Sequence, residues 1–156
     1  AHVRLWLRLG AAIRYEADMV VIDPFNEMSN EDRPPEMSMT EYVGFAIKQF
    51  KRAARKYQLH LILVAHPAKM LRGKDGKYPV PGLWDIADSA QFSNKADVGV
   101  VIHREDLINS NETCIRVVKS RYHSQIGKPG EIKGIWQEDV TRFLICSDGA
   151  GMSDQR

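Results

Sequence analysis

The sequence predicts an α/β fold in which a mostly parallel sheet is extended by antiparallel edge strands. Two observations lead to this prediction. Residues 19–65 follow the order strand, helix, strand, and that order at this spacing indicates a right-handed βαβ unit. After residue 97, four β-rich runs follow one another, which is typical of antiparallel strands added at the edge of a sheet.

Length and composition limit the function classes. The chain has 156 residues, and 22 Lys and Arg against 20 Asp and Glu give a net charge of +2, which excludes a strongly basic or acidic tail. The charged fraction of 27% and the apolar fraction of 44% are those of an ordinary globular domain. No apolar run is long enough to predict a membrane span. Two cysteines are too few for a disulfide scaffold, so we expect a reduced, intracellular compartment. Within the cell we expect the cytoplasm, with the mitochondrial matrix as the alternative.

The first elements follow from hydrophobic patterning. In residues 2–17, apolar side chains recur on one side of a helical wheel, which predicts a helix. Residues 19–22 are continuously apolar and are closed by Asp23 and Pro24, so we expect a buried, parallel strand. Residues 26–38 are polar and net negative and contain adjacent prolines, which predicts a long loop.

A second helix is expected to start at Thr40, and Ser38 with Glu41 three residues later has the spacing of a capping box. Apolar side chains between Val43 and Ala54 form one face of this helix. Its other face is basic and carries Lys48, Lys51, Arg52, Arg55 and Lys56.

The rest of the chain is expected to hold the second parallel strand and the antiparallel strands. Residues 59–65 are a second apolar run, and residues 67–83 are rich in Gly, Pro and Lys and are predicted to be loop. A short helix is expected over residues 84–92. Strands are predicted over 97–103, 113–119, 131–137 and 142–146, and residues 147–156 are expected to fray.

Asp23 and His66 close the two predicted parallel strands, so we expect them to be neighbours at one edge of the sheet. Asp23 suits a Mg²⁺-associated carboxylate at the Walker B position of a nucleotide site, or equally an aspartate that makes a turn before Pro24. His66 suits a residue that senses a terminal phosphate, or equally a hydrogen-bonded histidine at a strand end. The residues alone leave both alternatives open.

Residues 67–81 form a basic segment with a net charge of +3 and several glycines. A mobile basic loop with an aromatic side chain suits contact with a nucleic-acid backbone, although a solvated surface loop has the same composition. The cations are Lys69, Arg72, Lys74 and Lys77, and the aromatic side chain is Tyr78.

Lys119 and Arg121 lie two residues apart at the end of a predicted strand, where they would point the same way and could clamp a phosphate. The alternative is two exposed cations at a sheet edge. The chain contains no G-x-x-x-x-G-K-[ST] sequence, so it has no phosphate-cradling loop of that kind. Cys114 and Cys146 lie in apolar β runs and are expected in the core, and the histidines lack the spacing of metal ligands.

Four segments follow one another along the chain, namely residues 59–69, Trp84-Asp85-Ile86-Ala87-Asp88-Ser89, residues 94–104 and Val117-Val118-Lys119-Ser120-Arg121. In their order and spacing they resemble the C-terminal motor of DnaB-type hexameric replicative helicases, and the nearest branch is the Twinkle-like and phage primase–helicases. The first strand and its end, Val20-Val21-Ile22-Asp23-Pro24-Phe25-Asn26-Glu27, fit the Walker B strand of that branch.

The resemblance implies a RecA-like fold, truncated at its N-terminal side, over residues 1–147, with a flexible tail over 148–156. It implies part of an ATP-dependent helicase that translocates on single-stranded DNA, with ATP and Mg²⁺ as cofactors. The implied partners are single-stranded DNA, further subunits of a ring that is a hexamer in this family, and a linked primase or toprim-like domain.

The resemblance also implies roles for individual residues. Asp23 matches the Walker B aspartate that helps to hold Mg²⁺, and His66 matches the polar residue that couples the γ-phosphate to a DNA-binding loop. Lys119 and Arg121 match the lysine and the arginine finger that are offered to the nucleotide of the neighbouring subunit. Residues 67–82 match the central-channel loop.

Residues 85–97 match a second DNA-contacting stretch, but Ala87 stands where bacterial helicases often carry an arginine, so we expect Lys95 to substitute for it. The family's Walker A loop and catalytic glutamate precede the Walker B strand and are missing here, so the fragment alone is expected to be inactive. Two alternatives stay open, namely another RecA- or KaiC-class ATPase and a non-catalytic module for single-strand binding or oligomerisation.

Overall fold

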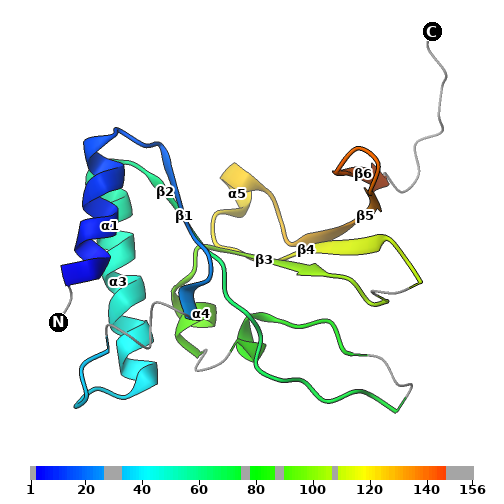
Figure 1. Cartoon of the computed structure of the whole chain (residues 1–156), viewed down its shortest axis with the longest axis horizontal. Helices are drawn as coiled ribbons and strands as arrows, with labels where there is room; N and C mark the ends of the chain where they lie inside the picture. The colour runs from blue at the N-terminus through cyan, green and yellow to red at the C-terminus, as the bar shows by residue number, and fades with distance from the viewer. Residues whose placement is uncertain (1–2, 27–32, 75–77, 87–89, 107–108, 147–156) are drawn as a thin grey trace, which may run out of the picture. The chain divides into compact units, whose positions relative to one another are not determined.

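The computed structural model describes residues 3–26, 33–74, 78–86, 90–106 and 109–146 (Figure 1). The chain divides into two compact units. The first unit is Ala1–Lys69 with Leu83–Ala96, and the second unit is Met70–Gly82 with Asp97–Arg156. The basic segment 67–82 therefore begins in the first unit and continues in the second.

The first unit contains the predicted strand–helix–strand order. Strand β1 (Met19–Ile22) is followed by helix α3 (Met39–Tyr57) and strand β2 (His60–Leu63). The two strands pair in parallel, from Met19 opposite His60 to Ile22 opposite Leu63. Helix α1 (Val3–Arg14) precedes β1, and both helices lie on the same side of the two strands (Figure 1). The predicted βαβ unit is confirmed.

The capping box predicted from Ser38 and Glu41 fixes the start of α3. The Ser38 hydroxyl oxygen accepts a hydrogen bond from the Glu41 amide at 3.3 Å, and the Ser38 amide donates to the Glu41 carboxylate at 3.0 Å. The helix begins at Met39, one residue before Thr40, because Ser38 is its N-cap. It ends at Tyr57, and the C-cap residue Gln58 adopts a left-handed conformation (φ 52°) and donates its amide to the Ala54 carbonyl.

Aromatic side chains from distant segments form the core of the first unit. Phe25 is 2% exposed, and its ring packs in a T-shaped arrangement against Phe50 from α3 and Phe92 from helix α4 (Ala90–Lys95). The ring centroids are 6.2 Å and 5.4 Å apart, respectively. Leu9 of α1 belongs to the same cluster. The short helix expected over residues 84–92 takes the form of the 3₁₀ turn η1 (Leu83–Asp85) and of α4.

Strands β1 and β2 bury one face each, so the expectation of fully buried strands is wrong for this chain. Val20, Ile22, Leu61 and Leu63 pack against the core, whereas Met19 and Val21 are both 54% exposed. The reason is that α1 and α3 cover the same side of the pair, and alternate side chains of a strand point to opposite sides.

The second unit holds a four-stranded antiparallel sheet in the order β3-β4-β5-β6. Its strands are β3 (Val98–His103), β4 (Glu112–Ser120), β5 (Gly130–Gln137) and β6 (Arg142–Cys146). The predicted α/β fold with a parallel pair and consecutive antiparallel strands is confirmed, and among the described residues no strand pairing joins the two sheets. Within the second sheet the connections are short, which favours antiparallel neighbours because a parallel neighbour would need a long crossover. The four-residue helix α5 (His123–Ile126) was not predicted.

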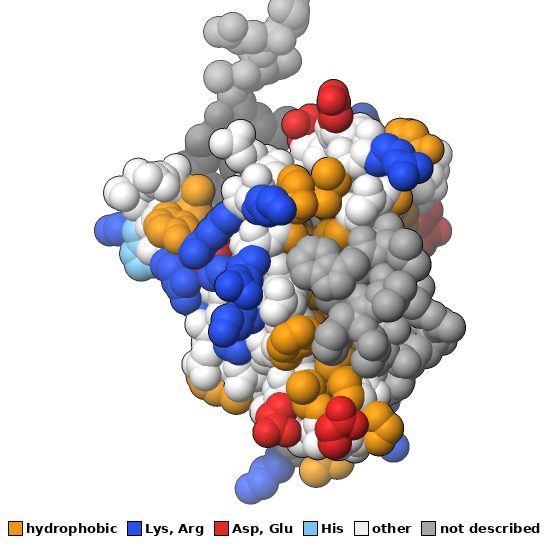
Figure 2. All heavy atoms as spheres, turned by 90° about the vertical axis from the view of Figure 1, so that its left-hand side faces the viewer, with side chains coloured by type: hydrophobic (Ala, Val, Ile, Leu, Met, Phe, Trp, Pro, Cys, Tyr) orange, Lys and Arg blue, Asp and Glu red, His pale blue; other side chains and the backbone are white. Residues whose placement is uncertain are grey.

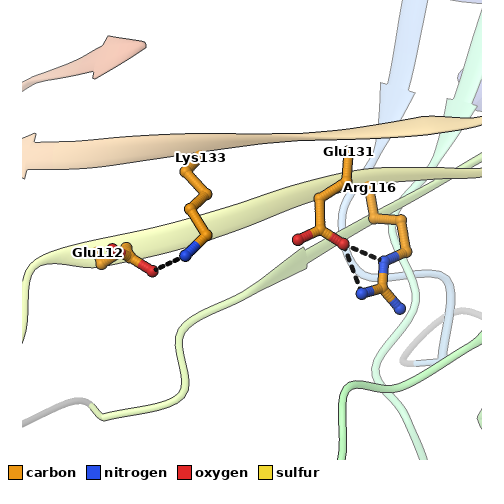
Figure 3. A network of polar contacts seen from close by, with 4 residues as sticks. All are labelled: Glu112, Arg116, Glu131 and Lys133. Carbon is orange, nitrogen blue, oxygen red and sulfur yellow. Dashed lines mark hydrogen bonds and ion pairs between the residues drawn. The ribbon is translucent and has the colours of Figure 1, made fainter. Parts of the chain in front are cut away.

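Two ion pairs link β4 to β5 (Figure 3). Arg116 lies directly opposite Glu131 and donates to its carboxylate at 2.6 Å, while Lys133 contacts Glu112 at 2.8 Å. The hydrogen bond from Arg116 lowers the pKa of Glu131.

Cys114, expected in the core, is half-buried on β4, and burial together with the nearby Glu131 raises the pKa of its thiol. None of the described helices is long and apolar enough to cross a membrane.

Candidate functional site

The ends of β1 and β2 are held together by backbone hydrogen bonds that continue beyond the strands. The Val64 amide donates to the Ile22 carbonyl at 2.9 Å, and the Phe25 amide donates to the Val64 carbonyl at 2.8 Å. Asp23 and His66, which follow these strands, are thereby brought to the same edge of the first unit, as predicted. The peptide bond between Asp23 and Pro24 is cis.

Asn26 connects the two strand ends directly. Its side-chain oxygen Oδ1 accepts a hydrogen bond from the backbone amide of His66 at 3.1 Å. The segment after β1 is thus fixed at two points, by Asn26 against His66 and by the buried ring of Phe25. Neither Asn26 nor Phe25 was among the predicted site residues. The sequence does contain a signal for them, because a large aromatic and an amide side chain directly follow the Asp-Pro that ends the strand.

Asp23 is exposed in a turn after β1, and its carboxylate forms no hydrogen bond or ion pair with another residue in the described ranges. Those ranges contain no group of three or more His, Cys, Asp or Glu side chains that could enclose a metal ion. Mg²⁺ in nucleotide sites is often held by one or two carboxylates together with phosphate oxygens. A single accessible carboxylate at a strand end fits that ligand set, and it equally fits a turn residue.

The loop that follows His66 is attached to η1. Pro67 forms an isolated antiparallel bridge with Ile86, and the Ala68 amide donates to the Asp85 carbonyl at 2.6 Å. The side chain of His66 is exposed. A displacement at His66 would therefore reach η1 through backbone contacts.

Lys95 anchors α4 against α3. Its ammonium group donates to the Gly44 carbonyl at 2.7 Å, while Lys51 donates to the Lys95 carbonyl at 2.9 Å. A Cβ atom on Gly44 would lie 3.0 Å from both Lys95 Nζ and Gln91 Cδ, so these two side chains would have to shift to accommodate a larger residue. The half-buried Lys95 already has a structural contact, and its predicted role in DNA binding stays a prediction. Ala87 lies outside the described residues.

The described cations of segment 67–82 are accessible. Lys69, Arg72 and Lys74 are exposed, and the Arg72 guanidinium lies over the Tyr78 ring at 5.0 Å from its centroid. Lys77 lies outside the described residues. Paired with Arg72, Tyr78 combines a stacking surface with positive charge, which suits a nucleic-acid strand. Contact with DNA at these residues stays a prediction.

Arg121 is held by Asp97 in the second unit. The guanidinium contacts the Asp97 carboxylate at 2.9 Å, and the Arg121 amide donates to the Asp97 carbonyl, also at 2.9 Å. Strand β4 ends at Ser120, so strand alternation does not extend to Arg121 as the sequence had suggested. Lys119 is half-buried and lies opposite Gly99, beside an irregularity in the β3–β4 register. Asp97 is a partner that the sequence analysis missed.

Comparison with known proteins places these features in a family. Residues 3–144 match the family model described as "DnaB-like helicase C terminal domain". The Twinkle homolog protein, chloroplastic/mitochondrial, of Arabidopsis thaliana is 37% identical over 122 residues, which are 75% of this chain and 17% of that protein.

Two solved structures share the fold, each at 18% sequence identity. One, described as an "ATPase Domain", has a TM-score of 0.71 over 94% of this chain. The other, a DnaB-like replicative helicase described with its interactions with primase, has a TM-score of 0.68 over 92% of this chain. The chain spans 52% and 34% of those two chains, respectively.

Proposed function

Because the chain belongs to the family of DnaB-like helicase C-terminal domains, we propose that it is part of an ATP-dependent, ring-forming replicative DNA helicase. The observation that best supports this proposal is the hydrogen bond from the His66 amide to Asn26. It joins the strand end that carries Asp23 to the start of a basic loop, which is the connection a motor needs between nucleotide and DNA.

In this proposal Asp23 supplies a carboxylate oxygen to Mg²⁺ in the nucleotide site. When bound, Mg²⁺–ATP would supply the β–γ phosphate bond that is hydrolysed and the free energy for movement. Asn26 orients the backbone at His66, so the exposed imidazole is held next to the end of β1. A small shift of His66 would move Pro67 and, through the bridge to Ile86, the η1 turn.

Arg121 is proposed to act on the nucleotide of the neighbouring subunit, as an arginine finger with Lys119 beside it. Such a residue requires a heterologous, ring-closing interface, because donor and recipient surfaces differ. In the free chain Asp97 neutralises Arg121. The guanidinium would therefore exchange a carboxylate for a phosphate when subunits meet.

A non-catalytic module for single-strand binding or oligomerisation is the second candidate. One observation favours it, namely the absence of a G-x-x-x-x-G-K-[ST] loop from the 156 residues. In the helicase proposal, that loop is contributed by polypeptide outside this sequence. Another RecA- or KaiC-class ATPase would not need a basic loop at residues 67–82.

Primase is proposed as a partner because one structural neighbour is described with it. The plant relative adds an organellar compartment as an alternative to the cytoplasm.

The test is phosphate release by a protein that joins this domain to a phosphate-binding loop, with and without single-stranded DNA. We expect DNA to stimulate hydrolysis. Replacement of Lys69, Arg72, Lys74 and Lys77 by alanine should remove the stimulation and preserve the DNA-independent rate. Hydrolysis that single-stranded DNA does not stimulate in either protein would contradict the helicase proposal and favour another ATPase. No hydrolysis at all would favour the non-catalytic module.

A further inference from the structure

The outward face of α3 is basic along its C-terminal half. Lys48, Arg52, Arg55 and Lys56 are exposed there, and the one acidic side chain of the helix, Glu41, is engaged in the capping box. Figure 2 views the molecule from the side of α1 and α3, and it shows Lys and Arg side chains gathered into one group on that face.

Lys48, Arg52 and Arg55 form what we call the α3 stripe. They are spaced four and three residues apart, so they lie on the same side of the helix, about one turn or ~5 Å apart along its axis. Among the described residues none of the three has an ion-pair partner. Lys56, beside the stripe, lies over the ring of its neighbour Tyr57 at 5.0 Å.

The stability of the helix does not explain the stripe. Basic residues in the last turn, such as Arg55 and Lys56, interact favourably with the helix dipole. Lys48 and Arg52 lie before that turn, and like charges four residues apart destabilise a helix. The pairs Lys48 with Arg52 and Arg52 with Lys56 have this spacing. The α3 stripe therefore opposes folding slightly, and a bound polyanion would relieve the repulsion.

We propose that the α3 stripe binds the phosphate backbone of single-stranded DNA without reading its bases, as a contact separate from the basic loop of residues 67–82. The inference rests on the proposed function in its choice of DNA as the polyanion. Three cations in a row, each about one turn from the next, can each reach a different phosphate of one strand, and such contacts release counterions.

The chemistry of the surface favours a nucleic acid over a protein partner or a membrane. Protein interfaces have an apolar, often aromatic centre, and membrane-surface helices insert an apolar face. All residues of α3 are described, and Tyr57 at its end is the one large apolar side chain that the helix exposes. The ammonium group of Lys56 lies over the Tyr57 ring. The stripe itself offers only charge.

The test uses the 156-residue chain and a fluorescent oligo-dT probe, with anisotropy measured between 50 and 200 mM salt. The stripe variant is Lys48→Gln, Arg52→Gln, Arg55→Gln. The matched control removes three exposed cations from other elements, Arg14→Gln, Lys128→Gln, Arg142→Gln. Each phosphate contact contributes about 0.7 to the slope of log affinity against log salt, so the stripe variant should lose about 2 from the slope. Over that salt range, the affinity of the unmodified chain should fall about 15–20-fold more than that of the stripe variant.

A charge-preserving variant, Lys48→Arg, Arg52→Lys, Arg55→Lys, should bind like the unmodified chain, which guards against a folding defect in the glutamine variant. An equal loss of slope in the stripe variant and the matched control would overturn the proposal, because net charge alone would then explain binding. So would stripe-dependent binding of a poly-glutamate peptide in place of oligo-dT, which would indicate an acidic protein partner.

The loop variant of residues 67–82, measured in parallel, separates this inference from the proposed function. Loss of slope in the stripe variant but not in the loop variant supports the α3 stripe and contradicts the role proposed for the loop. The reverse result overturns the inference and leaves the proposed function standing. Loss in both variants, with additive slopes, supports both.

Discussion

Replacement of Asn26 by alanine removes the side-chain oxygen that accepts the His66 amide at 3.1 Å. A typical intramolecular hydrogen bond contributes about 0.5–1.5 kcal/mol, and the exposure of this one places it at the lower end. The expected loss of stability is therefore about 0.5–1 kcal/mol. For a chain of this length, that corresponds to a fall in Tm of roughly 1–4 °C.

Asn26→Ala should change hydrogen exchange at His66 more than it changes exchange in the rest of the first unit. The backbone amide of His66 loses its acceptor, so its hydrogen exchange should accelerate about 2–5-fold in Asn26→Ala, as expected from a loss of this size. Amides in the middle of α3 should exchange as before. Hydrogen exchange followed by NMR resolves the single amide, and urea unfolding gives the global value.

Two further variants serve as controls. Asn26→Asp keeps an acceptor oxygen and should preserve slow exchange at His66. Asn109→Ala removes an amide that donates to Asp106 in the second unit, so it should leave His66 unchanged. If exchange at His66 is the same in Asn26→Ala and the unmodified chain, the bond does not connect the two strand ends, and the coupling route described above fails.

Three other perturbations test the packing and the titrating groups. Gly44→Ala should destabilise the chain by about 1–2 kcal/mol in urea unfolding, because overpacking outweighs the gain in helix propensity; Gly10→Ala, with no atom within 4 Å of the added Cβ, should be neutral or stabilising. The hydrogen bonds to Ser38 lower the pKa of Glu41, so the contribution of Glu41 to the free energy of unfolding should be complete above the ordinary pKa of a glutamate and be lost as pH falls through the lowered pKa. Glu41→Gln should remove this part of the acid dependence of urea unfolding, and an unchanged acid dependence would contradict the prediction. The raised pKa of Cys114 predicts slower alkylation than a free cysteine at pH 8, measured by peptide mass spectrometry, and an equal rate would contradict it.

Local signals in the sequence were sufficient for much of the fold. The capping box at Ser38 and Glu41 involves residues three apart, so the start of α3 follows from chemistry within one turn. The apolar run before Asp23 and the pattern between the two strands were sufficient to predict parallel pairing. The short helix α5 was missed because four residues carry too little periodicity.

The contacts that define the candidate site join residues far apart in the sequence. Asn26 and His66 are 40 residues apart, and Lys95 and Gly44 are 51 apart, so no local pattern announces either bond. Lys95 has the charge expected of a DNA contact, but tertiary packing directs it to a backbone carbonyl. Arg121 was interpreted as a phosphate clamp or an exposed cation, and its ion pair with Asp97, which depends on the β3–β4 register, was not predicted.

The most direct test of the proposed motor is a mixing experiment in a protein that joins this domain to a phosphate-binding loop. Arg121→Ala should bind nucleotide nearly as well as the unmodified protein but hydrolyse it about 10³-fold more slowly, because an arginine finger acts on charge that develops in the transition state. Asp23→Ala should also be inactive, for loss of the carboxylate in its own subunit. Mixed rings pair an intact finger with an intact pocket, so phosphate release should reappear on mixing; its absence, with subunit exchange verified, would contradict a nucleotide site shared between subunits.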